Sequence, residues 1–76
     1  MVFMLADVLK KEEGGLLVRD RKTGQEVFVH TDPRGFCVND SVGIFYNGVM
    51  TRSLPPQITA DSIRRLYPRA RRGRCR

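Results

Sequence analysis

Short runs of apolar residues, separated by turn residues, make up most of this chain. In the first run, Val2, Met4, Ala6 and Val8 alternate with Phe3, Leu5, Asp7 and Leu9. An alternation with a period of two places each set on one face of a β-strand. The later runs are rich in β-branched and aromatic residues, which favour strands. The pattern predicts strands at residues 2–9, 16–19, 25–31 and 41–46.

Turn residues stand between these runs. Gly24 closes the polar stretch 20–24 and suits a left-handed position in a hairpin turn. Residues 32–35 read Asp-Pro-Arg-Gly, the composition of a type I turn. The Asn47-Gly48 pair predicts a type I′ turn, after which residues 49–51 pair back briefly. Two prolines in residues 53–57 remove backbone donors, so this segment is predicted to be an extended loop.

The segment Ile58–Tyr67 fits two elements. Thr59 suits the cap of a short helix through Ile63 and Leu66, or the segment is a last strand. With this segment as a strand, the chain has five strands, no long helical period and no internal repeat. A barrel removes the exposed edges that so few strands would otherwise leave. We therefore predict an all-β fold, a five-stranded OB-like Greek-key barrel.

The stretch Asn39–Ile63 reads N-D-S-V-G-I-F-Y-N-G-V-M-T-R-S-L-P-P-Q-I-T-A-D-S-I. It resembles a family of small uncharacterised proteins of Gram-positive bacteria with the pattern G-D-x-V-x-V-x-Y/F-x-G, then S-x-P-x-Q-x-x-A and a final strand. The matching positions are Asp40, Val42, Ile44, Tyr46, Gly48, Ser53, Pro55, Gln57, Ala60 and Ile63, and Asn39 replaces a glycine. The resemblance implies an OB-like β-barrel with Ile58–Tyr67 as its last strand, and it implies no activity. Members of that family are often exported or lipid-anchored.

Composition indicates one small domain and a basic tail. The chain has 76 residues, 41% of them hydrophobic, and a formal net charge of +6. Because the last nine residues hold five arginines and no acid, the rest of the chain is almost neutral. We predict an OB-like domain at 1–67 and a disordered Arg-rich tail at 68–76. Such a tail either attracts nucleic acid or anionic lipid, or is simply solvated.

Export and metal signals are missing from the sequence. Met1–Leu9 has neither a basic region nor a cleavage site, and no run approaches the ~18 apolar residues of a membrane-spanning helix. We predict a cytoplasmic protein, although a start site further upstream would reverse this. In that compartment Cys37 and Cys75 are expected to be reduced. Two cysteines and one histidine do not complete a four-ligand zinc site, so we expect no metal and no cofactor.

Catalytic chemistry has few candidates in this chain. His30 lies two residues before Asp32 and seven before Cys37, and a Cys-His pair can activate a thiolate. No nucleophile motif surrounds these residues, and a small barrel offers no deep pocket. A solvent-facing His30 and a small apolar Cys37 explain the same residues. We predict that the protein is not an enzyme.

Binding is the better prediction. OB-folds bind oligonucleotides on the second and third strands and the adjacent loops. If Val27 and Val29 face the core, Phe28 and His30 face outward and form an aromatic platform beside basic residues. A shift of one residue would bury Phe28 instead. The predicted nucleic-acid-binding residues are Arg19, Arg21, Lys22, Phe28, His30, Arg52, Arg69, Arg71, Arg72 and Arg74.

These observations predict a non-catalytic, monomeric binding module for single-stranded DNA or RNA. The barrel face would stack bases, and the tail would attract phosphates in a salt-dependent way. The alternative is a protein-interaction or cell-envelope-associated module that does not bind nucleic acid. The segment 53–57 has two interpretations as well. It is either a preorganised recognition loop or the architectural crossing of one barrel end.

Overall fold

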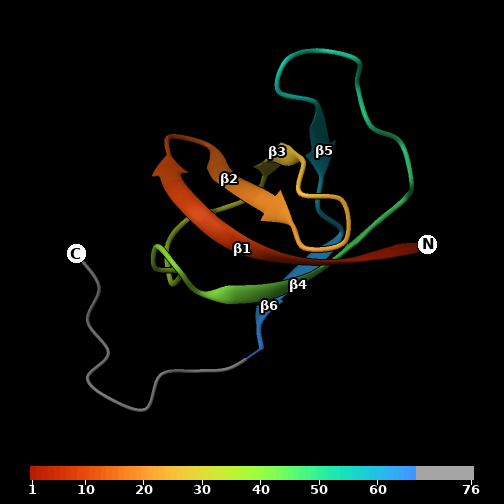
Figure 1. Cartoon of the computed structure of the whole chain (residues 1–76). Coiled ribbons are helices and arrows are strands. Elements are labelled where there is room, and N and C mark those ends of the chain that lie inside the picture. The colour runs from red at the N-terminus through yellow and green to blue at the C-terminus, as the bar shows by residue number, and fades with distance from the viewer. Residues whose placement is uncertain (67–76) are drawn as a thin grey trace.

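Six β-strands form one sheet in the computed structural model of the chain, which describes residues 1–66 (Figure 1). The described residues contain no helix, so the predicted all-β class is confirmed. The predicted tail lies outside the described residues. The strands are β1 (Val2–Glu12), β2 (Gly15–Asp20), β3 (Glu26–His30), β4 (Ser41–Tyr46), β5 (Gln57–Thr59) and β6 (Ser62–Arg65).

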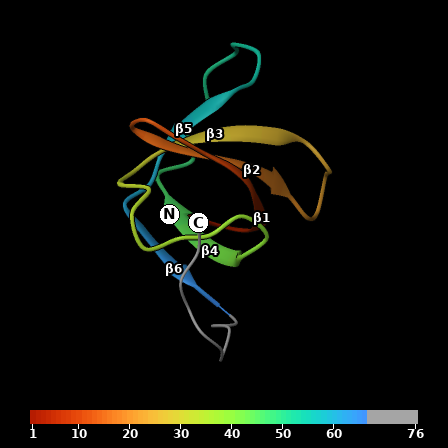
Figure 2. The ribbon, with the colours of Figure 1, turned by 90° about the vertical axis from the view of Figure 1, so that its left-hand side faces the viewer.

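The long strand β1 connects the two halves of the sheet. The strand order is β5-β3-β2-β1-β4-β6, and only β3 and β5 run parallel. The first half of β1 pairs with β4, and the second half pairs with β2 from Ala6 onward. The register shifts between Val8 and Lys10, and a shift of this kind bends a strand. As Figure 2 shows, β1 curves from the layer of β2, β3 and β5 to the layer of β4 and β6.

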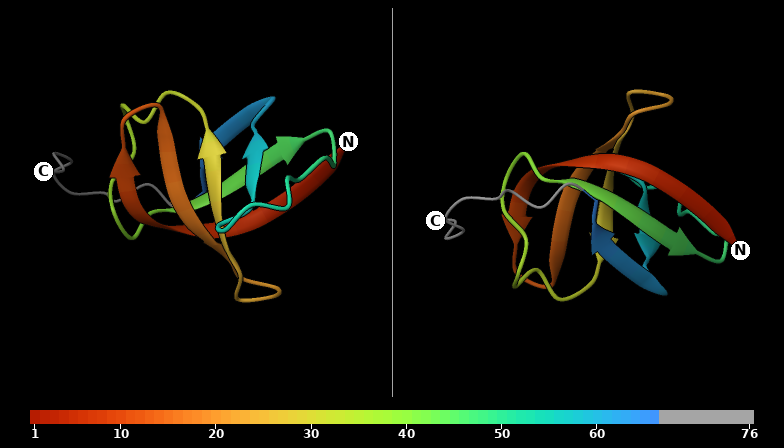
Figure 3. Two further views of the ribbon diagram at one scale, coloured as in Figure 1. Left: turned by 90° about the horizontal axis from the view of Figure 1, so that it is seen from above. Right: turned by 90° about the horizontal axis from the view of Figure 1, so that it is seen from below.

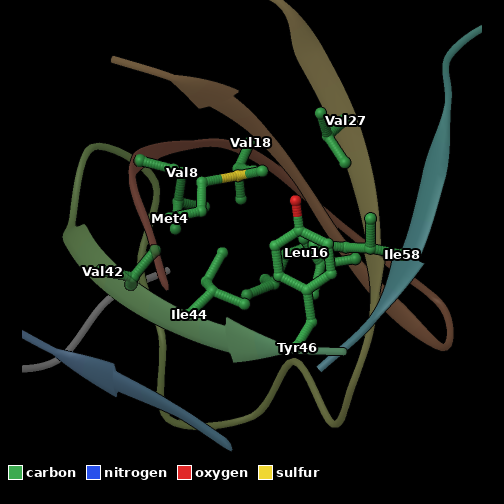
Figure 4. Close-up of a cluster of buried hydrophobic side chains, with 11 residues drawn as sticks. Met4, Val8, Leu16, Val18, Val27, Val42, Ile44, Tyr46 and Ile58 are labelled. Atoms are coloured by element: carbon green, nitrogen blue, oxygen red, sulfur yellow. The ribbon is translucent and has the colours of Figure 1, made fainter. Parts of the chain in front are cut away.

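The core lies between these layers and follows the predicted alternation. Val2 is exposed at the start of β1, but Met4, Ala6 and Val8 are buried. On the other strands the apolar residues of one face point inward, because a strand buries alternate residues. Figure 4 shows these side chains filling the space enclosed by the strands. The buried apolar residues are Met4, Ala6, Val8, Leu16, Val18, Val27, Val29, Val42, Ile44, Tyr46 and Ile58.

The predicted strand count and barrel closure are wrong, because the last strand is broken. The segment after the loop forms β5 and β6, separated by Ala60 and Asp61. β5 pairs with β3 and β6 pairs with β4, so each of these two short strands has only one partner strand. A closed barrel would require one continuous last strand that pairs with β3 on one side and with β4 on the other. The described residues therefore form an open six-stranded sheet with β5 and β6 at its edges, and the helical interpretation of this segment is also wrong.

The predicted hairpin turn before β3 forms, but a second predicted turn is displaced and one predicted pairing does not form. Gly24 has a φ of 77° and donates its backbone N–H to the carbonyl oxygen of Asp20 at 2.7 Å. The turn predicted at residues 32–35 is displaced by one residue, because the Phe36 N–H donates to the Pro33 carbonyl oxygen at 3.4 Å, while the Asp32 side chain accepts the Arg34 N–H at 3.0 Å. Residues 49–51 do not pair back as a strand. Instead the loop 47–56, which contains a cis Leu54–Pro55 peptide, crosses to β5.

Candidate functional site

The outer face of β2 and β3 carries Phe28 and His30, which the sequence placed outside in one of two possible registers. The buried Val27 and Val29 fix the register of β3, so Phe28 and His30 point away from the core. Across the β2–β3 pair, Leu17 lies opposite Phe28 and Arg19 lies opposite Glu26. The alternative register, in which Phe28 enters the core, is not the one adopted.

Phe28 is partly buried because its ring packs on Gly15. A Cβ atom added to Gly15 would lie 2.6 Å from Cζ of the Phe28 ring, so the ring covers the glycine backbone. The edge of the ring meets the imidazole of His30, with the ring centroids 4.9 Å apart and an interplanar angle of 83°. The ring is therefore held in one place and presents part of its surface to solvent.

His30 is positioned by β5. Its Nε2 lies 2.7 Å from Oε1 of Gln57, which stands beside Phe28 in the parallel β3–β5 pair. The backbone of Gln57 is fixed in turn by Thr51. The Gln57 N–H donates to Oγ1 of Thr51 at 3.0 Å, and the Thr51 N–H donates to the Gln57 carbonyl oxygen at 3.0 Å. The histidine therefore has a defined orientation although it is exposed.

A hollow of about 200 Å³ opens beside this histidine, between β5 and the loop 47–56. Apart from His30, its lining carries no ionisable side chain. Its lining combines amide and hydroxyl groups with apolar side chains, a composition suited to a planar, neutral group with hydrogen-bonding edges. The lining residues are His30, Asn47, Val49, Thr51, Gln57, Ile58 and Thr59.

The two arginines predicted for this face are each paired with an acid. Arg19 lies 3.5 Å from Glu26. Arg21 donates through two nitrogens to both carboxylate oxygens of Asp7, at 3.0 and 2.8 Å, and donates to Ser41 Oγ at 2.7 Å. This hydrogen-bonded guanidinium lowers the pKa of the Asp7 carboxyl, and the Ser41 hydroxyl adds to the lowering. The face therefore carries less positive charge than its arginines suggest.

The other predicted basic residues lie apart from this pairing. Lys22 is exposed in the turn between β2 and β3, where its backbone N–H donates to Asp20 Oδ1 at 2.8 Å. Arg52 is exposed on the same loop that lines the hollow, and the structure gives it no ion pair among residues 1–66. The other four predicted residues, Arg69, Arg71, Arg72 and Arg74, lie outside the described residues.

Sequence reasoning missed the contribution of the loop 47–56 to the hollow. Asn47 and Thr51 were assigned to a turn and a brief strand, and the sequence offered no signal for the pairing of β5 with β3. The segment 53–57 did indicate either a recognition loop or an architectural crossing. The structure gives Gln57 both a backbone tie to Thr51 and a side-chain contact with His30.

The sequence also raised Cys37 and His30 as candidates for catalysis or metal binding. Cys37 is disulfide-bonded rather than a reduced thiol, so the thiolate considered in the sequence is not present. His30 hydrogen-bonds an amide rather than a carboxylate. Within residues 1–66 no three His, Cys, Asp or Glu side chains gather in a way that could hold a metal ion. No helix in that range has the length and apolarity to cross a bilayer.

Comparison with protein-family models, curated proteins and solved structures gives no match for this chain.

Proposed function

We propose that the chain is a non-catalytic binding module of OB-like architecture that binds single-stranded nucleic acid. Its contact surface is the outer face of β2 and β3 together with the hollow beside the loop 47–56. Bases stack near Phe28 and His30, and one base edge enters the hollow. The observation that carries the proposal is that His30 and Gln57, which line the hollow, are hydrogen-bonded to each other while the Phe28 ring packs against His30.

The strand connections support the OB-like part of the proposal. An OB-fold is a partly open five-stranded barrel that binds oligonucleotides on strands two and three, beside the loop between strands four and five. Only Ala60 and Asp61 separate β5 from β6, and their N–H groups donate to the carbonyl oxygens of His30 and Phe45. Counted as one bent strand, β5 and β6 join β3 to β4 and give five strands in the OB order. The resemblance of Asn39–Ile63 to the small Gram-positive family agrees with this proposal.

The chemistry of the face supports a nucleobase as the bound group. A partly exposed ring offers a stacking surface that tolerates any base, because every base has a π-face. Neutral amides and hydroxyls, rather than paired charges, line the hollow. Since Arg19 and Arg21 are neutralised by acids, phosphate attraction falls to Lys22, Arg52 and the C-terminal arginines. Added salt should therefore weaken the phosphate contacts while it leaves the base contacts largely unchanged.

The test is an amide chemical-shift titration of the whole chain with short oligothymidylate, at low and at moderate salt. We expect shifts at Phe28, His30 and Gln57 that persist at moderate salt. Phe28→Leu keeps apolar cover over Gly15 but removes the aromatic face. It should weaken binding by about 1–3 kcal/mol, the usual value for one stacked base.

Phe45→Leu is the matched control, because Phe45 is also a partly exposed strand phenylalanine but lies on β4. It should leave the affinity unchanged. Equal losses for both variants, or shifts confined to residues 67–76 that vanish with salt, would contradict the proposed face.

A second candidate function rests on the exposed apolar side chains of the loop 47–56. Leu54 is 93% exposed and Val49 is 65% exposed. Hydrogen bonds hold this loop in shape, since Ser53 Oγ lies 2.7 Å from Thr51 Oγ1 and donates to the Pro55 carbonyl oxygen at 2.9 Å. A fixed, protruding leucine is suited to a protein partner. Binding of a protein that Leu54→Ala abolishes, without any oligonucleotide shifts, would favour the interaction or envelope-associated module.

A further inference from the structure

The two amide side chains that line the hollow are both hydrogen-bonded through their oxygen atoms. Oε1 of Gln57 lies 2.7 Å from Nε2 of His30, and because an amide oxygen only accepts, this imidazole nitrogen carries the hydrogen. Oδ1 of Asn47 accepts the Val49 N–H at 2.9 Å. The side-chain nitrogens of Gln57 and Asn47 have no partner among residues 1–66. The two amides therefore offer a ligand hydrogen-bond donors rather than acceptors.

The hydroxyl groups of the lining supply the acceptors. Ser53 Oγ donates its single hydrogen to the Pro55 carbonyl oxygen at 2.9 Å. Thr51 Oγ1 lies 2.7 Å from Ser53 Oγ and must therefore donate its own hydrogen there, while it accepts the Gln57 N–H at 3.0 Å. One lone pair of Thr51 Oγ1 remains for a ligand. The hydroxyl of Thr59 has no partner among residues 1–66 and can also accept a hydrogen bond.

The size of the hollow limits what it can hold. Its volume of about 200 Å³ lies below the ~300–1,000 Å³ of the clefts that hold drug-sized ligands. Figure 3 shows the loop 47–56, which supplies part of the lining, passing from the end of β4 to the start of β5. Val49 and Ile58 contribute apolar surface, against which a planar ring can pack. One six-membered ring therefore fits the hollow better than a larger group does.

We infer that the hollow selects thymine or uracil over cytosine and that Gln57 and Asn47 determine this specificity, an inference that rests on the proposed function. Thymine and uracil are pyrimidines with two carbonyl oxygens, one on each side of a ring N–H. The two amide nitrogens donate to these oxygens, and a threonine hydroxyl accepts the ring N–H. Cytosine carries an amino group where thymine carries its O4 oxygen. With cytosine one amide donor would therefore meet another donor, and both would lack a partner.

Base stacking alone does not produce this specificity. A partly exposed ring such as that of Phe28 accepts the π-face of every base, so preferences that come from stacking are modest. A preference that comes from hydrogen-bond donors should instead change when the donors are replaced. Glutamate and aspartate have the shapes of glutamine and asparagine but only accept. Gln57→Glu and Asn47→Asp therefore keep an oxygen for the bond to His30 or Val49 and remove the donors.

The test compares the affinities of the whole chain for oligothymidylate, oligodeoxyuridylate and oligodeoxycytidylate of one length, at neutral pH and one salt concentration, by fluorescence anisotropy. We expect the first two oligomers to bind about tenfold more tightly than the third, as for one well-formed set of base contacts. Gln57→Glu and Asn47→Asp should each bring this ratio to one or below. The added negative charge repels the phosphates of all three oligomers equally, so the ratio reports the base contacts.

Gln25→Glu is the matched control, because Gln25 is exposed just before β3 and does not line the hollow. It adds the same charge and should leave the ratio unchanged. A ratio that neither Gln57→Glu nor Asn47→Asp alters would overturn the assignment of specificity to the amides. Equal affinities for all three oligomers, with chemical shifts at Phe28 and His30, would overturn the specificity but leave the proposed function standing. Failure of every oligomer to bind would overturn the proposed function and the specificity with it.

Discussion

Two buried glycines of the sheet face different kinds of neighbour. An added Cβ on Gly15 would lie 2.2 Å from the backbone oxygen of Val29. An added Cβ on Gly43 would lie 2.7 Å from Cε1 of Phe3, whose side chain is half exposed. Backbone in a paired strand cannot move aside without loss of its hydrogen bonds, but an exposed ring can rotate. Glycine is therefore required more strictly at position 15 than at position 43.

The first prediction follows from this difference. Gly15→Ala should lower the free energy of unfolding by about 3 kcal/mol, the upper part of the usual range for overpacking. Gly43→Ala should lower it by about 1 kcal/mol, because Phe3 can give way. Urea unfolding of both variants checks the order. Equal losses would show that the Phe3 ring is as firmly held as the β3 backbone.

At the scale of elements, the ion pair of Asp7 and Arg21 ties together three strands. Asp7 lies on β1, Arg21 follows β2, and Ser41 at the start of β4 donates to Asp7 at 3.1 Å. Because the pair lowers the pKa of Asp7 in the folded protein, the ionised carboxylate stabilises the fold. That stabilisation is complete above the pKa of the unfolded chain, about 3.9, and is lost as the pH falls through the lower folded value.

Asp7→Asn should therefore reduce stability at neutral pH by about 1 kcal/mol, as expected for a half-exposed pair. The difference from the unchanged protein should shrink as the pH falls below about 4, because Asp7 then becomes neutral in both states. Thermal unfolding between neutral and acidic pH measures this. Asp61→Asn is the control, since the Asp61 side chain makes no hydrogen bond to any other residue in the range 1–66. A difference that stays constant with pH would assign the loss to something other than the carboxylate charge.

The faces of the strands could be predicted from the sequence, but the ends of the last strand could not. Alternation grouped Val27 with Val29 and Phe28 with His30, because side-chain period is a local property, but which pair faces the core was decided only by the structure. The break at Ala60 depends on which strands accept the two halves, and that pairing is not local. The β3–β5 pairing and the hollow beside it could not be predicted for the same reason. The acids that pair with Arg19 and Arg21 lie on other strands, so the net charge of the outer β2–β3 face could not be predicted from one segment of the sequence.

At the scale of the whole molecule, most of the net positive charge belongs to a part of the sequence that the proposed binding face does not include. Residues 1–66 contain nine basic and eight acidic side chains, and the other five arginines belong to residues 67–76. If the chain binds nucleic acid as proposed, long-range attraction of the anionic strand should depend mainly on the C-terminal arginines, and base stacking should depend on the sheet.

Replacement of Arg69, Arg71, Arg72, Arg74 and Arg76 by glutamine should separate these contributions. Each phosphate that the protein no longer neutralises should reduce the slope of log affinity against log salt by about 0.7 for a single strand. The chemical shifts of Phe28 and His30 at saturation should be the same as in the unchanged protein. Affinity measured by fluorescence anisotropy at several salt concentrations gives the slope. An unchanged slope would assign the phosphate contacts to Lys22, Arg52 and the rest of the sheet.

The division of β1 between two partners also has a consequence for the order of folding. β1, β2 and β3 are joined by short turns, so their pairings close small loops. The first half of β1 must wait for β4, which lies much further along the chain. A nascent chain thus presents a three-stranded meander before β4 has emerged, with the apolar start of β1 unpaired on both sides. The segment that remains half-paired in the finished sheet is the last part of the meander to be protected during synthesis.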